Sequence, residues 1–221
     1  YLFQFAKGDY ISPMDSDDIS HPERLRKEVA FLEAHPNVIL VGSHAKIIDA
    51  KGRITGTKRY ATDHEGIYKQ FAFFNPVVHP SCMIRRSLLP KREFLYHTHF
   101  GVNSDYYTLF DWLNYGAFAN IPEYLFSYRI HGANSSLTKL KQKFWTTANI
   151  RLQAVTKLNY RAPWWMFPAI ATQALLVAPL PEVLLKELFF YARGLKHLKI
   201  PTLVRVRLKM RQSIKYALSI R

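Results

Sequence analysis

Cysteine is nearly absent from this sequence, which has one, Cys82, among 221 residues. A lone cysteine excludes an internal disulfide framework and any zinc site built on cysteine ligands, and it is consistent with a reducing compartment. We expect Cys82 to be a small buried residue in a strand, because free cysteine behaves as a small apolar side chain.

Acidic residues are almost missing from the last third of the chain. Residues 139–221 hold 16 lysines and arginines but only 2 acidic residues, a net charge of +14. Residues 1–138 hold 15 basic and 14 acidic residues, a net charge of +1, so nearly all of the chain's +15 lies in the tail. Such a segment favours an anionic partner, either a membrane surface or a nucleic acid.

A secretory signal pattern is also missing, and the chain opens on Tyr1. What the sequence does have is apolar material, with 48% hydrophobic and 14% aromatic residues. This composition suffices for a sizeable core in one domain with an appendage. Apolar runs predict strands at 38–42 and 45–49, followed by a turn at 49–52, and helical periodicity predicts a helix near 65–74.

Three carboxylates follow the apolar run at 10–14. Asp15, Asp17 and Asp18 precede residues 20–25, whose Ser-His-Pro-Glu-Arg-Leu pattern has capping-box spacing and is typical of a helix start. A strand, then acids, then a helix predicts carboxylates at the carboxyl edge of an α/β sheet, where ligands usually bind. If the segment is extended, Asp15 and Asp17 project to the same side and can share a hard divalent cation with a phosphate-bearing ligand. A solvated turn or a helix cap remains the alternative.

Four short motifs surround these acids in order: Gly-Asp-Tyr-Ile at 8–11, Met-Asp-Ser-Asp-Asp at 14–18, Pro-Glu-Arg-Leu at 22–25 and Phe-Leu-Glu-Ala-His-Pro at 31–36. The series resembles the family 2 glycosyltransferases of the GT-A fold. In that family the acids form a DxD-type motif that holds Mn²⁺ or Mg²⁺ against the diphosphate of a sugar nucleotide. The resemblance implies metal binding by Asp17 and Asp15 and diphosphate contacts by Asp15 and Asp18, although Asp18 could instead complement a helix dipole.

A second acid, Asp105, lies in the stretch Asn-Ser-Asp-Tyr-Tyr-Thr-Leu-Phe-Asp-Trp-Leu at 103–113. Asn103 or Ser104 can cap a helix there, and an acid in its first turn could simply complement the helix dipole. The stretch also resembles the family's Glu-Asp-Tyr-x-Leu-Trp segment, whose aspartate is the catalytic base of inverting members. The resemblance implies that role for Asp105, while Ser104 stands where the family commonly carries another acid.

Two further segments extend the resemblance to about residue 136. His79, in a predicted His-Pro-Ser strand, is implied on the acceptor side, with a structural histidine as the alternative. Arg129 and His131, in Tyr-Arg-x-His, are implied as donor diphosphate contacts, with a strand-end ion pair and a turn histidine as alternatives. Because the Gln-x-x-Arg-Trp segment of processive synthases is absent from the sequence, we expect transfer of a single sugar.

The basic tail has its own pattern. We expect one helix over 139–160, and the segment 162–181 is uncharged for 20 residues, which is long enough to cross a bilayer. Its four prolines and a Trp-Trp pair favour an interfacial or re-entrant segment, with a transmembrane helix kept open. A further amphipathic face is predicted at Leu184, Leu185, Leu188, Phe189, Ala192 and Leu195.

Together these patterns predict a GT-A-like α/β domain over 1–138, a mixed sheet flanked by helices, followed by a basic helical membrane-associating region over 139–221. We expect the carboxyl-terminal portion of a longer, metal-dependent inverting glycosyltransferase. Its partners would be a nucleotide diphosphate sugar donor, a lipid-linked or cell-envelope glycan acceptor and an anionic membrane, on the cytoplasmic side of a bacterial inner membrane.

Two other functions stay open. A haloacid-dehalogenase-like phosphatase would use Asp15 as nucleophile and Asp17 as acid, since Asp-x-Asp after an apolar strand also opens that superfamily. A basic nucleic-acid-binding module would rest on charge alone, without a recognised fold motif or aromatic stacking platform, so we expect no nucleic-acid partner.

Overall fold

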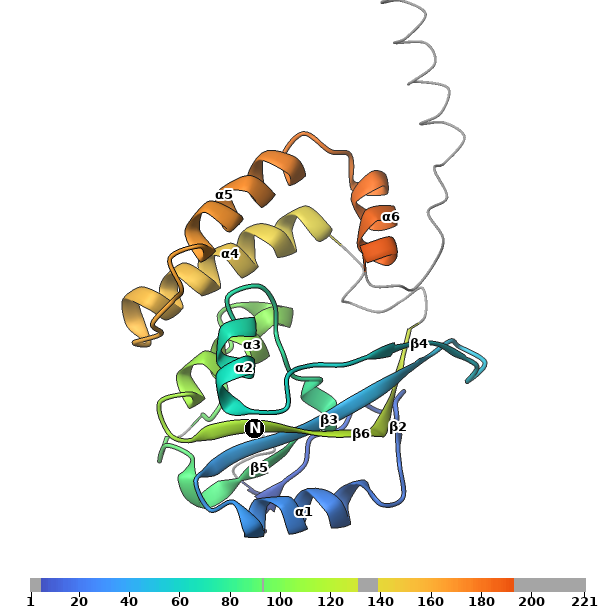
Figure 1. Ribbon diagram of the computed structural model, residues 1–221, viewed down its shortest axis with the longest axis vertical. Helices are drawn as coiled ribbons and strands as arrows, with labels where there is room; N and C mark the ends of the chain where they lie inside the picture. Colours follow the sequence, from blue (N-terminus) through green and yellow to red (C-terminus); the bar gives the residue numbers. More distant parts are fainter. Residues whose placement is uncertain (1–4, 93, 131–138, 193–221) are drawn as a thin grey trace, which may run out of the picture.

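The computed structural model describes residues 5–92, 94–130 and 139–192 (Figure 1). The strands are β1 (Tyr10–Ile11), β2 (Ile19–Ser20), β3 (Val38–Ile48), β4 (Ile54–Lys58), β5 (Met83–Arg85) and β6 (Ala117–Arg129). They form one mixed sheet in the order β1-β5-β3-β6-β2, and β4 pairs with β3. The helices are α1 (Arg24–Ala34), α2 (His64–Gln70), α3 (Ser104–Trp112), α4 (Leu140–Lys157), α5 (Met166–Val177) and α6 (Glu182–Ala192). Single 3₁₀ turns cover η2 (His79–Ser81), η3 (Arg86–Leu88) and η4 (Gly101–Asn103).

The central strand β3 is longer than the sequence predicts. The two strands expected at 38–42 and 45–49 are one strand, because Ser43 and His44 continue the parallel pairing with β6 through a register shift. The turn at 49–52 is confirmed. Asp49 Oδ1 accepts from the Lys51 backbone N–H at 2.8 Å, and Gly52 has a φ of +80°, a conformation that glycine adopts without steric cost.

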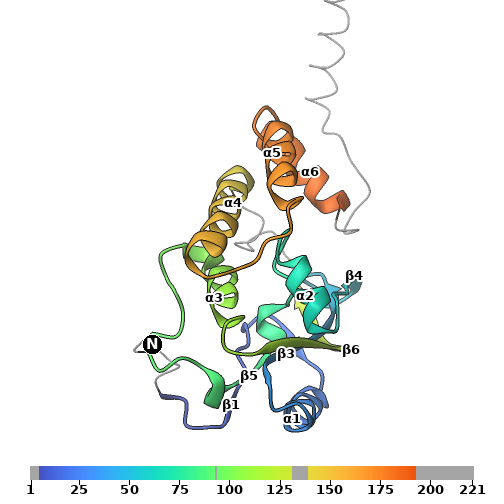
Figure 2. The same ribbon diagram turned by 60° about the vertical axis from the view of Figure 1, so that its left-hand side comes forward.

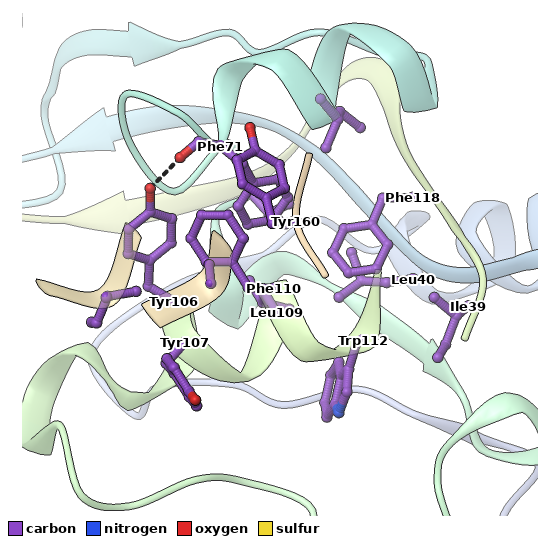
Figure 3. Packing of buried hydrophobic residues seen from close by; sticks show 14 of the residues in the cluster. Ile39, Leu40, Phe71, Tyr106, Tyr107, Leu109, Phe110, Trp112, Phe118 and Tyr160 are labelled. Atoms are coloured by element: carbon purple, nitrogen blue, oxygen red, sulfur yellow. Dashed lines mark hydrogen bonds between the residues drawn. The ribbon is translucent and has the colours of Figure 1, made fainter. Parts of the chain in front are cut away.

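Helices cover both faces of the sheet, with α1 on one side and α2 and α3 on the other (Figures 1 and 2). On the α1 side, Leu32 packs with Val41 and Leu125. The opposite side holds a larger aromatic core, in which Phe71, Tyr106, Phe110, Trp112 and Phe118 interlock (Figure 3). The helix α4 also contributes to this core through Ile150 and Ala154, although the predicted domain boundary assigns α4 to the tail.

The predicted capping box at Ser20 and Glu23 is wrong. Ser20 belongs to β2, where it pairs with Phe126 of β6, and α1 begins only at Arg24. Ser20, which the local pattern assigns to a helix cap, is therefore part of the sheet. The Glu23 backbone N–H instead donates to His21 Nδ1 at 3.2 Å.

An ion pair is buried between α1 and the sheet. Arg24 and Glu28 are 2% and 0% exposed, and their side chains approach to 3.5 Å without making a hydrogen bond. The Arg24 guanidinium donates instead to the Pro80 carbonyl at 2.9 Å and to the Ser12 hydroxyl. Both Glu28 carboxylate oxygens lack a hydrogen-bond partner among the described residues, and burial raises the pKa of Glu28 to about 8.

Glu28 predicts a pH dependence of stability. Its pKa rises from 4.5 in the unfolded chain to about 8 in the folded one, so between these values the folded state binds more protons. The contribution of Glu28 to the free energy of unfolding is therefore present below pH 4.5 and is lost as the pH rises toward 8. Urea titrations from pH 5 to 8 should show the wild type losing stability relative to Glu28→Gln. A constant difference between the two proteins would contradict this.

The tail helices agree in part with the sequence. The helix expected at 139–160 is confirmed as α4, while the uncharged segment 162–181 contains only the 12-residue helix α5, which ends before Pro179 and Pro181. No helix in the described ranges is long and apolar enough to cross a membrane.

Candidate active site

The acidic cluster forms a turn between β1 and β2. The Asp18 backbone N–H donates to the Asp15 carbonyl at 3.3 Å, so the segment is not extended, and the prediction that Asp15 and Asp17 project together by strand alternation is wrong. Asp15 is exposed, Asp17 is half-buried and Asp18 is buried. The residues after β1 turn back toward the sheet, where β2 pairs with β6.

Arg129, at the end of β6, fixes this turn to the sheet. Its backbone N–H donates to Asp18 Oδ1 at 2.7 Å, and its guanidinium donates to the Asp17 carbonyl at 2.6 Å and the Asp49 carbonyl at 2.9 Å. Asp49 directly follows β3, which runs parallel to β6. The acids therefore lie where β3 and β6 end, which confirms their predicted place at the carboxyl edge of the sheet.

Asp18 combines burial with an unsatisfied oxygen. Within the described ranges its Oδ2 is buried and accepts no hydrogen bond. Burial raises the pKa of Asp18 to about 6, and the nearby charges of Asp17 and Asp15 raise it further, while the Arg129 N–H opposes the shift. A buried carboxylate oxygen beside two other carboxylates is a site where a cation would relieve both desolvation and repulsion.

This donor set fits a hard cation such as Mg²⁺ or Mn²⁺. The described ranges contain no group of three histidine, cysteine, aspartate or glutamate side chains arranged to hold a metal. Magnesium in phosphate-binding enzymes commonly uses one or two carboxylates and takes its remaining ligands from water and substrate phosphates. The pair Asp17 and Asp18 meets that requirement. His131, the further predicted phosphate contact, lies outside the described residues.

Lys58 is a member of the site that the sequence reasoning missed. Its Nζ lies 4.1 Å from the centroid of the Tyr128 ring, and its charge lowers the pKa of Asp18. The pairing of β4 with β3, and of β3 with β6, brings this lysine beside the acidic turn. No local motif marks Lys58, so only the sheet topology could have found it.

Asp105 lies in the first turn of α3, as predicted. Asn75 donates its side-chain amide to Asp105 Oδ2 at 3.2 Å, and desolvation raises the pKa of this carboxyl despite its partial exposure. His79 and the Asn75 amide counteract part of the shift. Because its pKa is raised, this carboxylate is a stronger base than an ordinary aspartate and is chemically suited to accept a proton.

His79 joins the two acidic regions. It lies in the turn η2 rather than in the predicted strand, because the chain bends at Pro80 before β5 begins at Met83. Its Nε2 is 2.7 Å from the Tyr96 hydroxyl. Burial lowers the pKa of His79, while the charges of Asp105 and Asp15 raise it, so this histidine lies within electrostatic reach of both acids.

Cys82 is buried, as predicted, but it precedes β5 instead of lying within a strand. Its thiol donates to the Val78 carbonyl at 3.4 Å, and burial raises its pKa. The thiol is therefore a structural group beneath the η2 turn that carries His79.

Comparisons with known proteins show similarity to glycosyltransferases. Residues 1–92 match the sequence profile described as Glycosyl transferase family 2. An uncharacterized glycosyltransferase of Haemophilus influenzae is 27% identical over 157 residues, covering 67% of this chain and 49% of that protein. The O-antigen biosynthesis glycosyltransferase WbnJ of Escherichia coli is 29% identical over 163 residues, covering 71% of this chain and 61% of WbnJ. The chain thus spans about half the length of the curated relatives it matches.

A solved structure of S. aureus TarS 1–349 in complex with UDP is 14% identical, with a TM-score of 0.48, over 70% of this chain and 43% of that one. Independently of that likeness, the mixed sheet flanked by helices and the family match confirm the predicted GT-A-like α/β fold. The profile match over residues 1–92 and the relatives named as glycosyltransferases show that this chain is similar to the family 2 glycosyltransferases.

Proposed function

We propose that the full-length protein is a metal-dependent, inverting glycosyltransferase that moves one sugar from a nucleotide diphosphate sugar to a lipid-linked or cell-envelope glycan acceptor. The observation that carries this proposal is the acidic turn at the carboxyl edge of the sheet, which hydrogen bonds of Arg129 to Asp18, Asp17 and Asp49 tie to the ends of β3 and β6. The candidate general base Asp105 lies in the first turn of α3, where Asn75 donates to its carboxylate. The name of WbnJ, an O-antigen biosynthesis enzyme, supports a glycan acceptor.

In this proposal Asp105 performs the proton transfer. The acceptor hydroxyl attacks the anomeric carbon of the donor sugar as its proton passes to the Asp105 carboxylate, and the bond between that carbon and the diphosphate oxygen breaks. Attack opposite the leaving group inverts the anomeric configuration. Asn75 orients the carboxylate through its hydrogen bond to Oδ2.

The acidic turn binds the departing diphosphate. Two of these carboxylates, Asp17 with Asp15 or Asp18, would hold a divalent cation that neutralises the charge developing on the leaving group, and water and the donor phosphates would supply its other ligands. Lys58 adds a positive charge on the same side. Arg129 holds the turn in place through two backbone carbonyls, and a direct contact between Arg129 and phosphate stays a prediction.

The Asp17→Asn variant tests the metal site. It removes one charge from a hard-cation site while keeping the side chain's shape, so Mn²⁺-dependent binding of nucleoside diphosphates by the full-length protein should weaken at least tenfold, about 1.4 kcal/mol. Calorimetry with UDP, GDP and dTDP, with and without Mn²⁺, measures this. The exposed Asp9→Asn change is the matched control. Equal metal-dependent affinity in the wild type and in Asp17→Asn would remove Asp17 from the site.

A phosphatase using Asp15 and Asp17 is less well supported. The turn at 15–18 keeps both carboxylates close to the sheet edge, but that chemistry gives no role to Asp105 or to its contacts with Asn75 and His79. We retain glycosyl transfer because it uses both acidic regions.

We further propose that the protein acts as a peripheral protein on the cytoplasmic side of a bacterial inner membrane. The net charge of +14 over residues 139–221 supports attraction to anionic lipids, each basic residue near the surface adding about 1 kcal/mol. A lipid-linked acceptor would be met at that surface.

A further inference from the structure

The helix α5 exposes an unusually apolar face. Residues 162–181 include no charged side chain, and the outward side of this segment is uncovered. Its most exposed large side chains are Trp164 at 80%, Leu175 at 77% and Leu176 at 61%, with Phe167 at 45%. Figure 1 shows α5 on the side of α4 that faces away from the sheet. The opposite side of α5 is anchored, since Met166 is fully buried in the main core.

Basic side chains lie at both ends of this face. The exposed Lys157 and Arg161 precede Trp164, and Lys141 donates to the Ala178 carbonyl at 2.9 Å just after α5 ends. An uncharged apolar helix with cations at its ends matches a segment lying in the interface of an anionic bilayer. A tryptophan at the edge of such a helix suits the headgroup level.

The amphipathic face predicted from the sequence, on α6, is less suited to docking on a membrane. Leu185 is buried against the protein and Leu188 is 43% exposed, while Glu182 and Glu187 place acidic charge on the same helix. The side chains of Phe189, Ala192 and Leu195, which complete the predicted face, lie outside the described residues. The described part of the chain therefore favours α5.

We propose that the outward face of α5, formed by Phe167, Leu175 and Leu176, docks into the interface of an anionic lipid bilayer together with Trp164, which precedes the helix. This rests on the proposed membrane association and names the surface responsible. The occupant is a lipid surface because the apolar face is bordered by cations at both ends and belongs to a region of net charge +14.

The same surface is connected to the candidate base. Trp165 stacks on Phe73 with ring centroids 4.4 Å apart and an interplanar angle of 14°. Asn75, two residues after Phe73, donates to the Asp105 carboxylate. The Arg151 guanidinium of α4 donates to the Phe73 carbonyl. Docking by α5 would therefore orient the first turn of α3, which carries Asp105, relative to the bilayer.

The test is co-sedimentation of the full-length protein with vesicles of phosphatidylcholine alone or mixed with phosphatidylglycerol. The double variant Leu175→Asp with Leu176→Asp should lose at least tenfold in affinity for the anionic vesicles, since two exposed leucines can no longer insert. Leu188→Asp on α6 and Ile54→Asp on β4, which is 62% exposed, are matched controls and should bind as the wild type does. Addition of salt should weaken binding, and neutral vesicles should bind much less.

Several results would overturn the inference. If the double variant binds as the wild type does while Leu188→Asp does not, α6 is the docking face. If the wild type binds neither vesicle and the double variant converts a dimer to a monomer in sedimentation analysis, the occupant is a second copy of the chain. Mn²⁺-dependent nucleotide binding, measured in the same variants, should stay unchanged. If the wild type shows no Mn²⁺-dependent nucleotide binding, the proposed function is contradicted, whatever the vesicle experiments show about the docking surface.

Discussion

Replacing Asp105 by asparagine should leave donor binding intact and reduce sugar transfer by about 10²–10⁴-fold, the usual contribution of a general base. The amide keeps the size of the side chain and can still contact Asn75, but it cannot accept the acceptor's proton. Nucleotide binding by calorimetry and transfer by release of nucleoside diphosphate separate the two effects. The control is Asp63→Asn, because asparagine replaces aspartate well at the N-cap of α2.

The pH profile adds a readout that a purely structural role would not change. Burial raises the pKa of Asp105 above 3.8, and the active form is deprotonated, so kcat/KM should rise with pH through that elevated value. Asn75→Ala removes a donor that favours the charged carboxylate, and it should move this limb to higher pH. Near-normal turnover by Asp105→Asn, or an acid limb that Asn75→Ala leaves in place, would assign the base to another residue.

Replacing Arg24 by methionine should cost about 3 kcal/mol of the free energy of unfolding, the lower end of the range for breaking a buried ion pair. The lower end applies because Glu28, with its pKa of about 8, is already largely protonated at neutral pH and is not left as an unpaired buried charge when Arg24 is removed. The variant also removes the bonds to Ser12, which precedes the acidic turn, and to Pro80, which follows His79.

Urea unfolding measures this effect against Arg26→Met on the same helix, where the arginine is exposed and pairs with Glu23. The control should change stability by less than about 1 kcal/mol, as is typical of surface ion pairs. Equal effects of the two substitutions would mean that Arg24 does not link α1 to the segments that carry the site.

Much of this candidate site is predictable from the sequence because its signals are local. The acids after β1, Asp105 in the first turn of α3 and the turn at Asp49 all follow from short patterns, and the structure places them as expected. The sheet confirms the α/β class for the same reason, since alternating strand and helix patterns leave few alternatives.

The features that could not be predicted from the sequence depend on pairing between distant parts of the chain. Ser20 has the pattern of a helix cap but joins β2, because its backbone pairs with Phe126 more than 100 residues away. Lys58 reaches the acidic turn only through the pairing of β4, β3 and β6. His79 comes within electrostatic reach of Asp15 and Asp105 because the chain bends at Pro80. Such contacts follow from tertiary structure and have no local signature.

Transfer of labelled sugar is the most direct measurement of the proposed function. The full-length protein would be incubated with Mn²⁺, a panel of labelled nucleotide diphosphate sugars, and membrane lipid and envelope glycan extracts as acceptors. We expect label in the acceptor fraction, and we expect it to require the metal and to disappear in Asp105→Asn. Hydrolysis of a phosphate monoester that depends on Asp15, with no sugar transfer from any donor, would contradict it.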